Sequence, residues 1–279
     1  MKYAAFLHTC LCLLLAYSHT GLASTEPSQG LRLMLPLVGS LEPDATSRFY
    51  EQALHLALEK TNTGSEPIVF DHYPVDVKRE RARLLVKQGK LSIVWSSSNK
   101  AREAELLAIK FNLIRGINEY RLLLIRADDQ ARFDEVKTFA DLQKLRIGSG
   151  THWSDTEIYR FNGLPLVTSY AYPPMFRMLS IKRFDYMARS LQEVNYELEH
   201  YGKLGLAVEK NLVIHYPQPI YFFVSHNNQA LAERIHRGLE IASRDGSLDR
   251  LFFSIPNFRQ AWEQLQQLDH TVIQLKVPE

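Results

Sequence analysis

The residues with the clearest chemical potential are serines, an asparagine and an arginine that follow one another after an apolar stretch. Residues 91–95 (LSIVW) are apolar and β-branched, which predicts a buried strand. Ser98 or Asn99 is then placed to cap the helix that follows. Arg102 falls in the first turn of that helix, where the helix dipole disfavours a positive charge. Together with loop hydroxyls such as that of Ser97, this arginine would hold a carboxylate or another anion. In the alternative, Arg102 pairs with a neighbouring glutamate or with solvent.

A second turn with similar chemistry lies near the middle of the chain. A short strand ends in Gly148-Ser149-Gly150-Thr151, and Ser154 or Asp155 would cap the next helix. Main-chain amides and the Thr151 hydroxyl would then face an anion, with Trp153 beside them. In the alternative, the glycines only mark the passage from strand to helix.

Catalytic and metal-binding patterns are lacking in the sequence. Gly148-Ser149-Gly150 is not a G-x-S-x-G elbow, and neither a P-loop nor a G-x-G-x-x-G stretch occurs. The histidines are scattered without the spacing of metal ligands. Glu193, Glu197 and Glu199 are interpreted as the solvated face of one helix. We therefore expect a protein that is not an enzyme and that needs no cofactor and no metal.

Charge and cysteine content narrow the class further. The 279 residues carry a net charge of +2, so no overall field favours nucleic acid. A signal peptide over residues 1–23 is indicated by a basic residue, the apolar run Ala4–Tyr17 and small residues up to Ala23. Both cysteines, Cys10 and Cys12, lie inside it, so the mature chain would contain no thiol. We expect an exported, periplasmic protein without a nucleic-acid partner.

Strand and helix patterns alternate along the chain in two series. Residues 31–95 read as strand, helix, strand, helix and strand, which predicts a parallel sheet with crossover helices. The pattern restarts at Glu119, and extended segments near 113–118 and 216–219 are candidates for crossings between two lobes. Two such lobes meet at a cleft, the usual place for a small ligand. The fold class expected is α/β, each lobe being a mixed, mostly parallel sheet flanked by helices, with lobe one in 24–116 and 217–279 and lobe two in 117–216.

From about Leu31 to Phe253 the sequence resembles the type 2 periplasmic solute-binding proteins, specifically the polar amino-acid-binding (family 3) class of ABC transporter substrate-binding proteins. In that family a strand ends in a loop rich in serine or threonine, an arginine follows at the start of a helix, and an apolar segment crosses to the second lobe. Residues 96–102 (SSSNKAR) and 109–111 (IKF) follow this order. Further similar motifs are Asp141-Leu142 before Arg146–Thr151, Lys182–Tyr186, and Asp245–Leu248.

The resemblance implies a periplasmic-binding-protein-like II fold with two hinge crossings. It gives the ligand carboxylate to Arg102 and Thr151 and a hydroxyl contact to Ser97. In two places the sequence departs from the family: Gly39–Pro43 replaces a proline–phenylalanine stretch, and Arg189 stands near where an acid holds the ligand ammonium. A standard α-amino acid therefore does not follow from the resemblance. The expected ligand-binding residues are Ser97, Ser98, Arg102, Thr151, Trp153 and Asp185.

The function expected from these features is that of an exported, monomeric solute-binding protein. It would close on a small polar or anionic molecule, for instance one bearing a carboxylate, and deliver it to a membrane permease. A first alternative is a receptor module that presents its ligand-bound state to a membrane sensor. A second is an enzyme on the same fold, because a fold does not fix a function.

Overall fold

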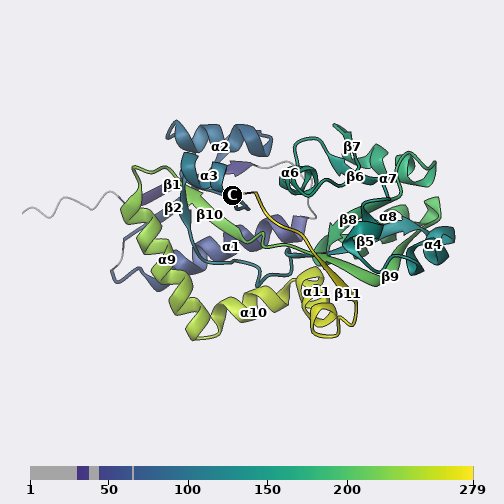
Figure 1. Cartoon of the computed structure of the whole chain (residues 1–279). Helices are drawn as coiled ribbons and strands as arrows, with labels where there is room; N and C mark the ends of the chain where they lie inside the picture. The colour runs from purple at the N-terminus through teal and green to yellow at the C-terminus, as the bar shows by residue number, and fades with distance from the viewer. Residues whose placement is uncertain (1–29, 38–43, 65, 279) are drawn as a thin grey trace, which may run out of the picture.

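The chain folds into two α/β lobes, as Figure 1 shows. The computed structural model describes residues 30–37, 44–64 and 66–278. The α/β class and the two-lobed architecture expected from the sequence are therefore confirmed. The predicted signal peptide, residues 1–23, and the departure at Gly39–Pro43 lie outside the described residues.

The first lobe is built on two small groups of strands. A parallel pair has the order β1-β2, and an antiparallel group has the order β3-β10-β4. The antiparallel group arises because β10 returns from the second lobe and runs between two earlier strands. Its elements are β1 (Leu31–Leu37), α1 (Asp44–Lys60), β2 (Ile68–Asp76), α2 (Arg79–Lys87), β3 (Val94–Ser97), α3 (Lys100–Glu105), β4 (Leu107–Ile109), β10 (Ile220–Val224), α9 (Gln229–Arg244) and α10 (Ser247–Ser254).

The second lobe is built on one six-stranded mixed sheet with the order β11-β9-β5-β8-β6-β7. The pairs β6–β7, β6–β8 and β11–β9 are parallel, and β5 runs antiparallel to β8 and β9. Its elements are β5 (Tyr120–Arg126), the 3₁₀ helix η1 (Ala127–Asp129), α4 (Gln130–Asp134), α5 (Phe139–Leu142), β6 (Ile147–Gly150), α6 (Ser154–Phe161), β7 (Leu166–Ser169), α7 (Tyr172–Ser180), β8 (Tyr186–Ser190), α8 (Leu191–Tyr201), the 3₁₀ helix η2 (Gly202–Leu204), β9 (Leu206–His215), α11 (Pro256–Gln266) and β11 (Thr271–Gln274).

The last part of the chain does not stay with the first lobe. The sequence division assigned residues 217–279 to lobe one, but α11 packs against α8 and β11 joins the sheet of lobe two. The physical reason is burial, because Ile273 and Leu275 belong to the apolar core of the second lobe. The chain thus passes between the lobes a third time, from α10 to α11, in addition to the two expected crossings.

Helical spacing of apolar residues explains how the first lobe is held together. Phe49, Tyr50, Ala53, Leu54, Ala57 and Leu58 recur at the helical period and are all buried in one core cluster. That cluster also contains residues of α9 and α10, and of the second lobe near the crossings. Gly238 of α9 packs so closely on α1 that an added Cβ would lie 1.8 Å from the Ala57 carbonyl oxygen. The α1–α9 contact therefore requires glycine at this position.

Candidate functional site

A cavity of about 300 Å³ lies where the two lobes and the second crossing meet. The first lobe contributes the loop after β3 and the start of α3, and the second lobe contributes the start of α6. A site built from both lobes is the arrangement that hinge closure acts on. The lining residues are Ser98, Asn99, Lys100, Ala101, Glu103, Ser154, Glu157, Ile158, Pro217, Gln218, Pro219, Val277 and Pro278.

The loop on the first-lobe side is held in place by its own hydrogen bonds. The Asn99 side chain accepts a 2.8 Å bond from the Arg102 main-chain N–H and so caps α3, which decides between the two expected capping residues. The Ser98 amide donates to the Pro219 carbonyl at 2.8 Å, and its hydroxyl donates to Glu103 at 2.6 Å. That hydroxyl, followed by Lys110, lowers the pKa of Glu103 from its usual value. The loop is thereby fixed to the crossing beside the cavity.

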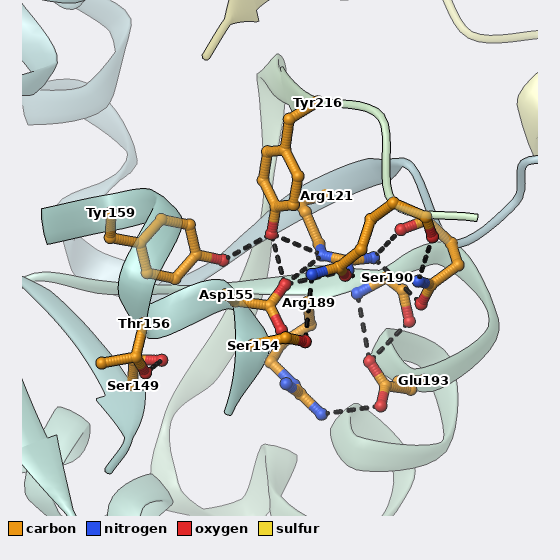
Figure 2. Close-up of polar contacts among 12 residues, drawn as sticks. Arg121, Ser149, Ser154, Asp155, Thr156, Tyr159, Arg189, Ser190, Glu193 and Tyr216 are labelled. Atoms are coloured by element: carbon orange, nitrogen blue, oxygen red, sulfur yellow. Dashed lines mark hydrogen bonds and ion pairs between the residues drawn. The ribbon is translucent and has the colours of Figure 1, made fainter. Parts of the chain in front are cut away.

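A buried polar network, drawn in Figure 2, adjoins the cavity, because Ser154 and Gln218 belong to both. Arg121, whose side chain is 4% exposed, donates from Nε and Nη2 to one Asp155 oxygen at 3.0 and 2.9 Å. Tyr216 also donates to Asp155 and lies 3.0 Å from the Tyr159 hydroxyl. Burial raises the pKa of Asp155, but the Arg121 guanidinium and the Tyr216 hydroxyl outweigh it, so this pKa is lowered. The pair is therefore charged at neutral pH.

This network reaches the cavity through Gln218 of the second crossing. Gln218 accepts a hydrogen bond from Arg121 and donates from Nε2 to the Ser154 hydroxyl at 3.0 Å. Asn118 of the first crossing donates to the Gln218 carbonyl at 3.0 Å. Both crossings and the start of α6 are thus joined by one set of hydrogen bonds, which fixes two polar groups in the cavity wall.

A second charged group lies beside the first, around Arg189 at the end of β8. Arg189 donates from Nε to both oxygens of Glu197, at 2.8 and 2.9 Å, and lies 3.1 Å from Glu193. Its guanidinium stacks 4.4 Å from the centre of the Trp153 ring. The expectation of a solvated glutamate face is wrong for Glu197, which is 1% exposed, and holds for Glu199. The cause is local, because α8 begins directly after β8 and carries Glu197, eight residues after Arg189, against that guanidinium.

The three ligand-binding residues expected in the first lobe lie in different positions relative to the cavity. Ser98 lines the cavity. Ser97 is the last residue of β3 and pairs with Ile220 of β10. Arg102 is buried at 9% exposure within α3 and does not line this cavity, although its neighbours Ala101 and Glu103 do.

The three expected second-lobe residues also separate. Thr151 follows β6, and its buried hydroxyl has no hydrogen-bond partner within the part of the chain that the structure describes. Trp153 precedes α6 and stacks on Arg189. Asp185 lies in a different charged group, where it accepts hydrogen bonds from the Arg132 side chain at 2.8 Å and the Arg146 amide at 2.7 Å. The structure thus brings Asp185 together with arginines and not with the cavity.

The glycine turn near Thr151 has a packing role. A Cβ on Gly148 would lie 2.4 Å from the Phe184 ring, and one on Gly150 would lie 2.4 Å from the Trp153 ring. Both glycines therefore make room for aromatic rings in the second lobe. This finding favours the structural interpretation of the glycines themselves, while Thr151 keeps its position before α6.

Sequence reasoning missed the charged residues beside the cavity. Arg121 and Arg189 each lie in a strand that is otherwise largely apolar, residues 120–126 and 186–190. A charged residue inside a buried strand needs a partner, and this signal is visible in the sequence. The partner of Arg121 is not visible there, since Asp155 lies in a helix 34 residues further along the chain. The partner of Arg189 is close in sequence, since Glu197 lies eight residues later on the helix that directly follows the strand.

Within residues 30–37, 44–64 and 66–278, no group of three His, Cys, Asp or Glu side chains is placed to hold a metal ion. Among the same residues, no helix combines the length and apolar character that crossing a bilayer needs.

We predict that the folded protein is destabilised by acid. The pKa of Asp155 and that of Asp185 are lowered by arginine partners and hydrogen bonds that outweigh burial. A depressed carboxyl pKa contributes stability above its unfolded value, about 4, and this contribution is lost as the pH falls through the folded value. Urea unfolding should therefore show little change from pH 7 to pH 5 and a marked loss below about pH 4. Asp185→Asn should be less stable at pH 7 and show a shallower acid loss. Equal stability of the wild type at pH 3 and pH 7 would contradict the assignment.

Comparison with known proteins gives the fold a family context. No family model matches the sequence, and no curated protein matches it significantly. Solved structures do match. An ancestral arginine-binding protein bound to arginine has a TM-score of 0.60 and 15% identity, covering 82% of this chain and 99% of that chain. A probable amino-acid ABC transporter extracellular-binding protein from Bacillus subtilis has a TM-score of 0.60 and 16% identity, covering 82% and 98%.

A sensor protein is among the similar structures as well. A histidine kinase sensor domain with similarity to periplasmic binding proteins has a TM-score of 0.59 and 14% identity, covering 82% of this chain and 97% of that chain. Several of the similar structures are described as amino-acid-binding or substrate-binding proteins. The fold expected from the sequence is therefore confirmed: this chain shares the two-lobed fold of these solved binding proteins.

Proposed function

We propose that this protein is a solute-binding protein that closes its two lobes on a small polar ligand. The observation that carries the proposal is the cavity shared by the Ser98–Glu103 loop, the start of α6 and the second crossing. Its polar lining from Ser98, Asn99, Ser154 and Gln218 offers donors and acceptors in fixed positions. Ligand sites of this size bind chiefly by enclosure and a few placed polar groups.

The ligand in this proposal bears a carboxylate or another anionic group. Thr151 does not line the cavity, but it lies just before Ser154, which does, and its buried hydroxyl has no hydrogen-bond partner among the described residues. This hydroxyl supports an acceptor on the ligand at the second-lobe side. Arg102 would supply the charge on the first-lobe side, as the resemblance implies, with Ser97 at the end of β3 just before the loop. Ser98 and Trp153 complete the proposed set. Asp185 is left out of it, because its oxygens are engaged by arginines.

Export and transport belong to the same proposal. The apolar leader over residues 1–23 supports export with cleavage after Ala23 and loss of both cysteines. The partner would be a membrane permease, and the protein would act as a monomer with no cofactor. Intact-mass analysis of the exported protein should give a chain that begins near Ser24, and a retained Cys10 would contradict this part.

The experiment that tests binding is a titration of the mature protein with the twenty standard amino acids and simple carboxylates. A binder should raise the unfolding temperature, because a ligand that binds only the folded state stabilises it. Small-angle scattering with that binder should show a smaller radius of gyration as the lobes close. Steady consumption of the binder by catalytic amounts of protein would instead identify an enzyme.

A ligand-sensing receptor module is the second candidate, favoured by the likeness to a histidine kinase sensor domain. The two candidate functions predict different effects on ligand uptake when the gene for this protein is deleted. Loss of ligand uptake on deletion supports transport. Unchanged uptake, with a membrane sensor captured only in the presence of the ligand, supports the receptor.

A further inference from the structure

The segment 271–278 is attached to the second lobe by main-chain pairing. Its first half, β11, runs parallel to β9 with Thr271 opposite Leu212 and Gln274 opposite His215. The Leu275 amide continues the pairing with a 2.9 Å bond to the His215 carbonyl. Leu275 is 2% exposed, and it packs in the core of the second lobe. This half of the segment is therefore a structural part of that lobe.

The segment is attached a second time at the end of α6. Asn162, which follows α6, donates from Nδ2 to the Lys276 carbonyl at 2.7 Å and accepts from the Lys276 amide at 3.0 Å. The same amide group also donates to the Ile158 carbonyl within α6 at 2.7 Å. Since Ser154 and Ile158 of α6 line the cavity, the segment is fixed to the element that forms the second-lobe wall.

Beyond this attachment, the chain enters the space between the lobes. Val277 and Pro278 line the cavity together with Lys100 and Ala101 of the first lobe. In Figure 1 the yellow chain leaves β11 and ends between α3 and α6. Six residues supply the apolar part of the cavity lining: Ala101, Ile158, Pro217, Pro219, Val277 and Pro278.

We propose that Val277 and Pro278 form an apolar wall of the ligand cavity that moves with the second lobe and selects ligands with an apolar portion. This inference rests on the proposed function of the cavity as the ligand site. The polar part of the ligand would face Ser98, Asn99 and Gln218, and the apolar part would face the wall. An apolar wall cannot satisfy a polar group that loses its water, so it disfavours a ligand that is polar at both ends. Each methylene buried against it should contribute about fourfold in affinity.

The first test uses the aliphatic series L-alanine, L-valine and L-leucine, with L-asparagine as the polar probe. Calorimetric titration of the wild type should give affinities that rise along the series and a preference for leucine over asparagine. Val277→Asn places an amide in the wall and should lower that preference by at least about tenfold. The matched control is Lys276→Ala, which removes an exposed side chain and keeps both main-chain bonds to Asn162. An unchanged preference in Val277→Asn overturns the proposal.

The second test needs no ligand and so separates this inference from the proposed function. The double variant Val277→Gly, Pro278→Gly removes the wall and leaves β11 and its core residues in place. Hydrogen exchange of the ligand-free protein should then become several-fold faster in residues 98–103, with β9 and β11 unchanged. If hydrogen exchange in residues 98–103 of the double variant equals that of the wild type, the proposal that Val277 and Pro278 form a cavity wall is overturned. If hydrogen exchange in residues 98–103 becomes faster in the double variant but no probe binds the wild type, the apolar wall is supported and the proposed ligand class is wrong.

Discussion

Arg121→Ala should lower the free energy of unfolding by about 3–5 kcal/mol, the cost of leaving a buried charge without its partner. Arg121 is 4% exposed, and its guanidinium donates to Asp155, Tyr216 and Gln218. Alanine would leave the Asp155 carboxylate, whose side chain is 16% exposed, with the Tyr216 hydroxyl as its remaining donor among the described contacts. The same change removes one of the hydrogen bonds that fix Gln218 in the cavity wall, so any ligand affinity should fall together with stability.

The measurement is urea unfolding of the ligand-free protein, with two further variants beside it. Arg32→Ala removes an arginine whose ion pair with Asp71 is exposed at 67% and 33%, so it should cost less than about 1 kcal/mol. Arg121→Met combined with Asp155→Leu removes both charges and should recover part of the loss. A single variant Arg121→Ala as stable as Arg32→Ala would show that the network beside the cavity contributes nothing.

The parts of the fold that the sequence predicts are those set by local patterns. The apolar residues of α1 recur at the helical period, and all of them are buried. The sequence limits the N-cap of α3 to Ser98 or Asn99, and in the structure the cap is Asn99. Strand boundaries are predicted less accurately: the strand expected at 91–95 is β3 at Val94–Ser97, because pairing with the distant strand β10 sets its limits.

The parts that the sequence does not predict depend on partners far away in the chain. β11 is only four residues long, and its pairing with β9 follows from the burial of Ile273 and Leu275 in the second lobe. Asp155 looks like a helix-capping residue until β5 places Arg121, 34 residues earlier, beside it. The composition of the cavity wall is equally hidden from the sequence, because Ser154, Gln218 and Val277 lie on three separate segments of the chain. Periodicity and capping report on neighbours in sequence and carry no signal about such contacts.

Arg102→Ala should weaken binding of a carboxylate ligand by about two to four decades in dissociation constant. A carboxylate enclosed between the lobes loses its water and must be met by charge and hydrogen bonds. Two cations of α3 are candidates: Lys100 lines the cavity and is exposed, whereas Arg102 is 9% exposed. We expect the larger effect at Arg102, because a buried guanidinium makes a two-pronged contact, while an exposed ammonium stays hydrated.

The test is calorimetric titration of Arg102→Ala, Arg102→Lys and Lys100→Ala with the tightest-binding carboxylate found for the wild type. Arg102→Lys should recover only part of the affinity, since lysine cannot make the two-pronged contact. The Arg102 stem is buried in the first lobe, so its loss will also lower stability, and each titration must be run well below the unfolding temperature of that variant. Full affinity in Arg102→Ala together with a large loss in Lys100→Ala would place the anion at the cavity surface and make Arg102 a structural residue. Loss in Arg102→Ala alone, in a variant that remains folded, would assign the ligand charge to the buried guanidinium.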